Sequence, residues 1–122
     1  MTTLPAQHLD RADALDLLAT ARTGRVIYTV AAMPAVWPSF FQVAPDGGVL
    51  LRTPAGSEPA RAVGGTLVAF EADRLDDDGG GWCVTLLGRA VVSAGDGATG
   101  AVEIHILPEA VHGRLFPALA DG

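Results

Sequence analysis

The chain has 122 residues, of which 49% are hydrophobic, 18% charged and 6% aromatic, and its formal net charge at pH 7 is −6. A chain of this length supports one hydrophobic core, so we expect a single domain over residues 1–122. The apolar fraction is too high for intrinsic disorder. The single cysteine, Cys83, excludes an intramolecular disulfide and favours a reducing cytoplasm.

The charge distribution argues against nucleic acid and membrane partners. The eight basic residues are all arginines, and they are scattered from Arg11 to Arg114 instead of forming the clustered face that phosphate neutralisation needs. Residues 1–9 lack the basic and apolar regions of a signal peptide. The longest apolar stretch, residues 26–43, is interrupted by Pro34 and Pro38, so the sequence predicts no membrane helix.

In chain order, the sequence predicts a leading helix followed mainly by strands. Asp10 is a suitable N-cap, Leu15 and Leu18 lie on one helical face, and Gly24 is expected to end this helix. Runs of β-branched and aromatic residues predict strands over residues 25–30, 35–43, 49–53, 66–73, 82–93 and 102–107. Pro38 cannot donate to a strand ladder, so we expect it at an edge or a bulge.

Loops and helices complete the expected elements. Ser57 is a good N-cap and Pro59 suits a first turn, which predicts a short helix over residues 58–63. Residues 75–81 hold three aspartates and three glycines and predict a solvated, mobile loop. Residues 108–119 have helical character. These elements favour a mainly β fold, a six-stranded antiparallel barrel with a leading helix and a short inserted helix, with a sandwich or an open sheet as alternatives.

The sequence contains no self-contained catalytic motif: G-x-S-x-G, H-E-x-x-H, C-x-x-C and a Walker loop are all missing. We expect no metal site. The run at residues 76–78 lacks the spacing of calcium ligands. His105 is expected on the strand face opposite Ile104 and Ile106, and His8 and His112 are expected to be structural or solvated.

One short stretch has the composition of an anion site. Arg52 and Thr53 end a predicted strand, a loop of small residues follows, and a helix begins at Ser57. Backbone N–H groups, hydroxyls and a guanidinium in this arrangement can hold a phosphate monoester. An N-capped turn with a surface arginine is the alternative interpretation.

Six sequence blocks, taken in order, resemble a known family. They are GRVIYT (24–29), PAVWP (34–38), LRTPAGS (51–57), VAFEAD (68–73), GWCVTLLGRA (81–90) and VHGR (111–114). The set resembles the FMN-binding split-barrel family that includes pyridoxamine 5′-phosphate oxidase, in particular its short actinobacterial-type members. The resemblance implies a six-stranded split barrel that forms a homodimer, with one FMN in each of two clefts between the subunits.

The resemblance also implies positions for the cofactor. It implies a phosphate site at Arg52, Thr53 and Ser57. It implies that the flavin ring lies against the stretch that contains Pro38, Ser39 and Phe40, and that Trp82 and Cys83 lie near the cofactor, with cysteine in place of the usual serine. From the residues alone, Trp82 is expected in the core or a dimer interface, and Cys83 is expected to be a small buried apolar residue without a reactive thiolate.

Two departures from the family pattern weaken the expected cofactor site. Relatives commonly carry a cation just after the loop serine, whereas this chain has Glu58 and Pro59, and a carboxylate beside a phosphate is repulsive. Phe40 stands about where relatives have an asparagine. Arg61, one turn into the short helix, is a candidate for the missing second cation.

These observations leave competing functions. The first is an FMN-dependent oxidoreductase acting on an unidentified small-molecule substrate, with the cofactor carrying the electron transfer. The alternative is a degenerate family member that binds FMN weakly or not at all and acts as a non-catalytic ligand-binding or structural dimer. Haem or a deazaflavin coenzyme in the same cleft is a third possibility, without a sequence feature in its favour.

Overall fold

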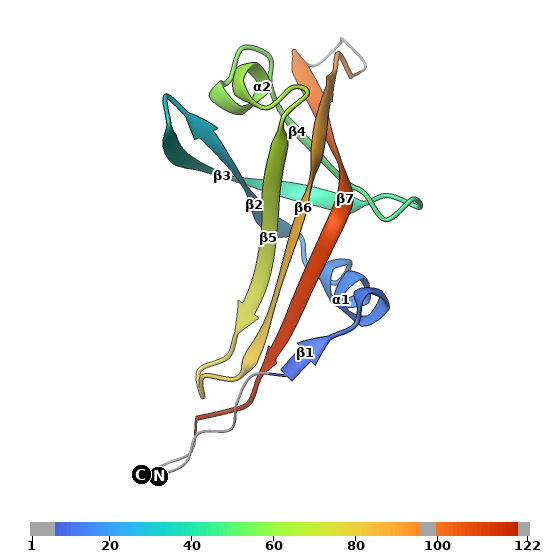
Figure 1. Ribbon diagram of the computed structural model, residues 1–122, viewed down its shortest axis with the longest axis vertical. Helices are drawn as coiled ribbons and strands as arrows, with labels where there is room; N and C mark the ends of the chain where they lie inside the picture. Colours follow the sequence, from blue (N-terminus) through green and yellow to red (C-terminus); the bar gives the residue numbers. More distant parts are fainter. Residues whose placement is uncertain (1–6, 96–99, 120–122) are drawn as a thin grey trace.

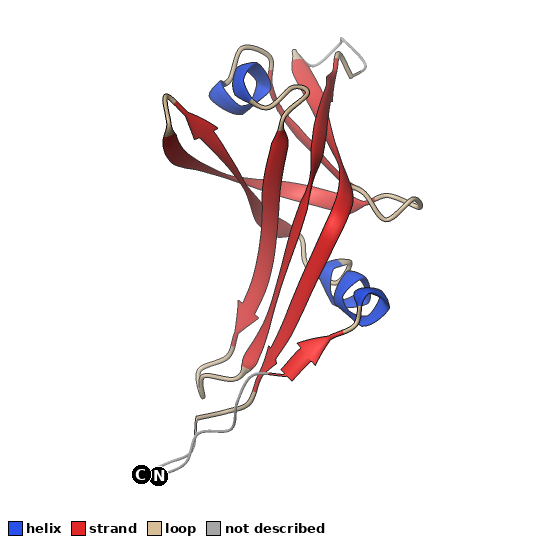
Figure 2. Ribbon diagram, in the orientation of Figure 1, coloured by secondary structure: helices blue, strands red, loops and turns tan. Residues whose placement is uncertain are grey.

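The structure, a computed structural model, describes residues 7–95 and 100–119, and in these ranges it consists of seven strands and two short helices (Figures 1 and 2). In chain order these are β1 (Gln7–Leu9), α1 (Arg11–Leu18), β2 (Thr23–Val30), β3 (Met33–Val43), β4 (Val49–Pro54), α2 (Glu58–Ala62), β5 (Leu67–Leu75), β6 (Gly81–Ser93) and β7 (Ala101–Phe116). In this described part, neither helix is long and apolar enough to cross a membrane.

The strands form one antiparallel sheet in the order β1-β7-β4-β3-β2-β5-β6, and β7 also pairs with β6. This second pairing closes β2 to β7 into a six-stranded barrel, which confirms the predicted fold class. The three-residue β1 was not predicted. It pairs with the C-terminal part of β7, where Leu9 lies opposite Gly113.

Strand pairing around the barrel is very uneven. β6 and β7 pair along almost their whole length, from Gly81 opposite Phe116 to Ser93 opposite Glu103. β3 and β4 pair only over residues 41–43 and 49–51, after which β3 continues along β2 and β4 continues along β7. The barrel is therefore split between β3 and β4. Pro38 lies in the part of β3 that pairs with β2 alone, as predicted for an edge position.

The core lies inside the barrel and shows the alternation expected of half-buried strands. In β5, Val68, Phe70 and Ala72 are buried, while Glu71 and Asp73 lie on the outer face. Phe70 meets Phe41 of β3 edge-on, with ring centroids 4.8 Å apart.

The predicted start of α1 is confirmed, whereas its predicted end is wrong. The Asp13 N–H donates to Asp10 Oδ1 at 2.8 Å, as an N-cap requires. The helix ends at Leu18, and Gly24 lies in β2 instead. A Cβ at Gly24 would come within 2.5 Å of the Phe70 ring, so this glycine permits close packing and does not cap a helix.

The helix predicted over residues 108–119 is wrong, because β7 continues to Phe116. Pro108 lies opposite Gly88 at a register shift, where a missing backbone N–H does little harm to the ladder. Beyond the shift, β7 pairs with β6 on one side and with β1 on the other. Pairing on both edges outweighs the local helical preference of this segment.

The predicted loop at residues 75–81 is shorter than expected, since Leu75 and Gly81 are strand ends. Its turn has internal hydrogen bonds: Asp76 N–H donates to the Gly80 carbonyl at 2.7 Å, and Gly80 N–H donates to Asp78 Oδ1 at 2.8 Å. The mobility of this turn stays a prediction.

Candidate functional site

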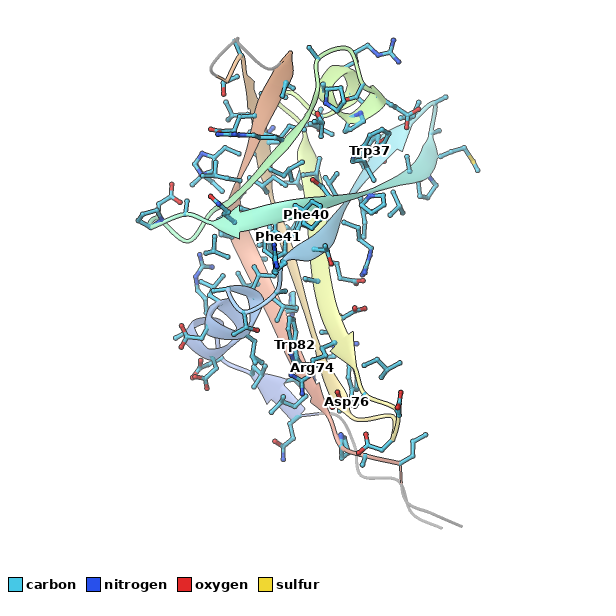
Figure 3. All side chains as sticks on the ribbon, turned by 180° about the vertical axis from the view of Figure 1, so that it is seen from behind. Trp37, Phe40, Phe41, Arg74, Asp76 and Trp82 are labelled. Atoms are coloured by element: carbon cyan, nitrogen blue, oxygen red, sulfur yellow. The ribbon has the colours of Figure 1, made fainter. Side chains whose placement is uncertain are left out.

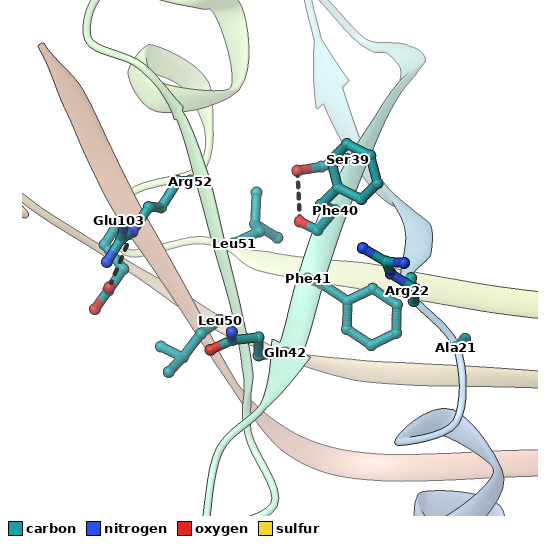
Figure 4. Close-up of a pocket in the computed structure, with 10 residues that line it drawn as sticks. All are labelled: Ala21, Arg22, Ser39, Phe40, Phe41, Gln42, Leu50, Leu51, Arg52 and Glu103. Carbon is teal, nitrogen blue, oxygen red and sulfur yellow. Dashed lines mark hydrogen bonds and ion pairs between the residues drawn. The ribbon is translucent and has the colours of Figure 1, made fainter. Parts of the chain in front are cut away.

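A cavity of about 610 Å³ lies where β3 and β4 separate (Figure 4). This volume is in the range of small-molecule sites. The lining residues come from the segment before β2 and from β3, β4 and β7: Ala21, Arg22, Ser39, Phe40, Phe41, Gln42, Leu50, Leu51, Arg52 and Glu103. The cavity therefore brings together Ser39 and Phe40, predicted to contact a flavin ring, and Arg52, predicted to contact its phosphate.

Arg52 stands beside a carboxylate that the sequence did not indicate. It pairs with Glu103 across the β4–β7 ladder, and its Nε lies 3.9 Å from Glu103 Oε2. The Arg52 side chain is 69% exposed and that of Glu103 33% exposed, so water screens this ion pair and it contributes little to stability. Glu103 is nevertheless the acidic residue of the cavity.

Arg22 is a second cation of the cavity that sequence reasoning missed. It lies in the connection between α1 and β2, and its carbonyl accepts the N–H of Phe41 at 3.1 Å, which fixes its backbone to the cavity wall. Figure 4 shows Arg22 near Phe41, on the other side of Leu51 from Arg52 and Glu103. Only the β2–β3 pairing brings Arg22 here, so no local sequence signal could have found it.

Thr53 and Ser57 lie next to each other but do not line the cavity. Thr53 is 2% exposed, and the Ser57 hydroxyl donates to Thr53 Oγ1 at 3.1 Å. Ser57 also caps α2 as predicted, accepting the Ala60 N–H at 3.4 Å. Both hydroxyls are engaged within the protein, and their contact with a phosphate stays a prediction.

Glu58 has a partner of its own within the barrel. The hydroxyl of Tyr28, a core residue of β2, donates to Glu58 Oε1 at 2.7 Å. Burial and this hydrogen bond raise the pKa of Tyr28 to about 12. Arg61 is exposed in the last turn of α2 and does not line the cavity. The carboxylate next to Arg52 is Glu103, and the repulsion between Glu58 and a phosphate stays a prediction.

Trp82 and Cys83 lie outside the cavity lining. Trp82 is 7% exposed in the core, further along the sheet than Phe40 and Phe41 (Figure 3). Cys83 is half-buried on the outer face, and burial, reinforced by the Glu71 carboxylate, raises the pKa of its thiol. The raised pKa favours the protonated thiol, and the contact of both residues with a cofactor stays a prediction.

One histidine of the described residues, His105, lies beside a carboxylate, that of Asp46. His105 lies on the face opposite the buried Ile104 and Ile106, as predicted, and its Nε2 is 3.3 Å from Asp46 Oδ2. Over residues 7–95 and 100–119, no group of three histidine, cysteine or acidic side chains is placed to hold a metal ion.

The chain is thus a six-stranded split barrel with a polar and aromatic cavity where β3 and β4 separate. A family model described as pyridoxamine 5′-phosphate oxidase matches residues 10–118, and the chain belongs to this family. The chain is also 42% identical over 88 residues to the uncharacterized protein Rv0080 of Mycobacterium tuberculosis, a match that covers 67% of this chain and 57% of the relative's length.

Solved structures share the fold. A protein described as the FAD binding protein from Mycobacterium smegmatis superposes with a TM-score of 0.79 at 33% identity, covering 93% of this chain and all of that chain. A conserved protein of unknown function from Corynebacterium diphtheriae gives a TM-score of 0.75 at 25% identity, covering 93% and 99%. These likenesses identify the fold as that of flavin-binding split barrels.

Proposed function

We propose that this protein binds a flavin nucleotide in the cleft between β3 and β4 and acts as a flavin-dependent oxidoreductase on a small-molecule substrate. The observation that carries the proposal is that a single cavity joins Ser39 and Phe40 to Arg52. An aromatic wall suits a planar ring, and a guanidinium suits a phosphate.

The cavity fits such a ligand in size and chemistry. Its volume of about 610 Å³ is sufficient for a nucleotide-sized molecule. When bound, the flavin would supply hydride or electron transfer. The residues of the chain would bind and orient it: Arg52 would contact the phosphate, Phe40 and Phe41 would contribute apolar surface, and Leu51 would help to exclude water.

We propose FMN as the ligand, because it contains the ring and the phosphate that the cleft matches. FAD contains the same two parts, and the M. smegmatis relative that is 33% identical is described as an FAD binding protein. FAD is therefore titrated beside FMN in the experiment that tests this proposal.

We also propose that the working form is a homodimer. On the outer face of the barrel, the aligned positions Val36, Ile27, Ala69, Leu87 and Ala110 form an apolar row across five strands. Val36 is 55% exposed and Leu87 41% exposed. A second copy of the chain would cover this row and would enclose the cleft from the outside.

One observation favours the alternative, a family member with weak or absent flavin binding. Phe40 stands about where the family resemblance places an asparagine, and its phenyl side chain, 72% exposed, has no group that could donate a hydrogen bond to a flavin ring or accept one from it. In that case the dimer would have a non-catalytic or structural role.

The decisive experiment is an absorbance spectrum of the purified protein, followed by titration with FMN and with FAD monitored by flavin fluorescence. We expect binding of at least one flavin. Arg52→Ala should weaken it about ten- to hundredfold, because charge-assisted hydrogen bonds contribute roughly 1.5–3 kcal/mol. Glu109→Ala, an exposed substitution in β7, is the control. Failure of both flavins to bind would favour the non-flavin alternative.

A further inference from the structure

The two arginines of the cleft differ in whether a carboxylate lies beside them. Arg52 has Glu103 beside it, with 3.9 Å between Nε and Oε2. No hydrogen bond or ion pair engages the guanidinium of Arg22 within the described part of the chain. Arg22 is therefore the cation of the cavity that has no carboxylate to offset it.

The position of Arg22 on the wall is fixed by the main chain. Its carbonyl accepts the Phe41 N–H at 3.1 Å, and the ladder between β2 and β3 begins with the next residue, Thr23 opposite Phe40. The backbone of Arg22 is thus held at the start of a strand pair, while its side chain is exposed and free to meet a ligand. Such a preformed backbone lowers the cost of ordering the residue on binding.

We propose that Arg22 is a second anion-recognition residue of the cleft, across from Arg52, and that Glu103 opposes anion binding by offsetting the charge of Arg52. The inference rests on the proposed function for the ligand class, a phosphate-bearing flavin. It also replaces two expectations from the sequence. The second cation of the site is Arg22 instead of Arg61, and the opposing carboxylate is Glu103 instead of Glu58.

Elementary electrostatics supports this assignment. A phosphate that approaches Arg52 also approaches Glu103, so the attraction of one charge is reduced by the repulsion of the other. At Arg22 the attraction is not reduced. Because the cavity is partly closed by Phe41 and Leu51, both buried, water screens these charges less than on an open surface.

The test compares two ligands that differ by a single phosphate, FMN and riboflavin. We expect Arg22→Gln to raise the dissociation constant of FMN about tenfold and to change that of riboflavin by less than about twofold. Glu103→Gln should lower the FMN dissociation constant about threefold. Both effects should shrink in about 0.5 M NaCl, since salt screens them.

Matched variants control for net charge. Arg11→Gln removes an exposed arginine at the start of α1, and Glu109→Gln removes an exposed carboxylate of β7. Neither should change FMN binding by more than about twofold. If Arg22→Gln weakens FMN and riboflavin equally, or weakens neither, Arg22 does not recognise the anion and the inference is overturned.

A second measurement does not depend on the flavin. Titration with inorganic pyrophosphate, followed by the NMR resonance of the Arg22 side-chain Nε–H, should shift that resonance, and the shift should saturate at lower pyrophosphate in Glu103→Gln. A shift in a protein that binds no flavin would support the inference and reject the proposed flavin function. An unmoved Arg22 resonance together with wild-type flavin affinity in Arg22→Gln would reject the inference alone.

Discussion

The β6–β7 pair and the β3–β4 pair are both antiparallel neighbours in the same barrel, yet they differ in almost every physical respect. β6 and β7 remain paired from Gly81 and Phe116 to Ser93 and Glu103. β3 and β4 share only three paired positions, Phe41 to Val43 with Leu51 to Val49, before they part. The long ladder encloses core side chains, whereas the short one leaves a cavity with two arginines and a glutamate.

The difference shows where this small barrel keeps its stability and where it opens a cavity. Along β6, Trp82, Val84, Leu86 and Ala90 are buried at alternate positions. Where β3 and β4 part, their backbone groups no longer pair with each other, so polar side chains and a ligand can occupy the space between them. We therefore expect substitutions in β6 to change folding and substitutions in the cleft to change binding.

The largest effect is expected from Leu86→Ala in β6. Leu86 is 1% exposed, and its loss leaves a cavity in the core, so the free energy of unfolding should fall by about 2–5 kcal/mol. Leu75→Ala, at the 73% exposed end of β5, should cost less than about 0.5 kcal/mol. Urea denaturation measures both. Equal effects of the two variants would mean that the long ladder is not the stabilising region.

The outer face provides the next prediction. Leu87 neighbours Leu86 in sequence but points outward, into the apolar row that we propose a second copy covers. Leu87→Asp would place a charge in that interface, so the dissociation constant of the dimer should rise by at least about 100-fold while the fold persists. Light scattering at micromolar concentration should give a dimer mass for the native chain. A monomer mass would reject both the proposed dimer and the proposal that a second copy encloses the cleft.

The link between Tyr28 and Glu58 holds α2 to the barrel where β3 no longer pairs with β4. Tyr28 is the single tyrosine, so absorbance at the tyrosinate band reports its titration directly. We expect a midpoint near pH 12, and a lower one in Glu58→Gln, because the carboxylate favours the protonated phenol. A midpoint near pH 10 in the native chain would contradict the hydrogen bond.

This pKa has a consequence for stability. The folded-state pKa of Tyr28 is raised above its ordinary value of 10.0, so its contribution is complete below about pH 10 and is lost as the pH rises towards 12. Tyr28→Phe should lower the free energy of unfolding by about 1 kcal/mol at neutral pH. Because phenylalanine does not titrate, the variant should also lose less stability than the native chain as the pH rises from about 10 towards 12.

Sequence reasoning worked best where a local pattern decides the structure. Runs of β-branched and aromatic residues predicted five of the six barrel strands closely, and Asp10 and Ser57 both cap helices as predicted. It failed over residues 108–116, because pairing with β6 and β1 decides that segment and neither partner can be read from its own sequence.

The candidate site was predictable only in part, for the same reason. The resemblance of the sequence to the family singled out Arg52 and Phe40 as site residues, and both line the cavity. Arg22 and Glu103 belong to no motif, and they reach the cavity through the β2–β3 and β4–β7 pairings. The hydrogen bond between Tyr28 and Glu58 could not be predicted either, because it joins residues 30 positions apart in sequence.

The smallest effect is expected at the turn that joins β5 to β6, where the longest ladder begins. Replacing Asp76, Asp77 and Asp78 together by serine removes the exposed ion pair between Arg74 and Asp76, with 3.2 Å between Nε and Oδ1, and exposed pairs contribute little. A serine at position 78 can still accept the Gly80 N–H that Asp78 Oδ1 accepts now. The three adjacent carboxylates also repel one another, so their removal brings a partly compensating gain. The melting temperature should therefore move by only a few degrees, and flavin affinity should not change.

Calorimetry with and without Ca²⁺ completes the test, since a rise in melting temperature with the ion in the native chain but not in the variant would reveal a cation site in this turn.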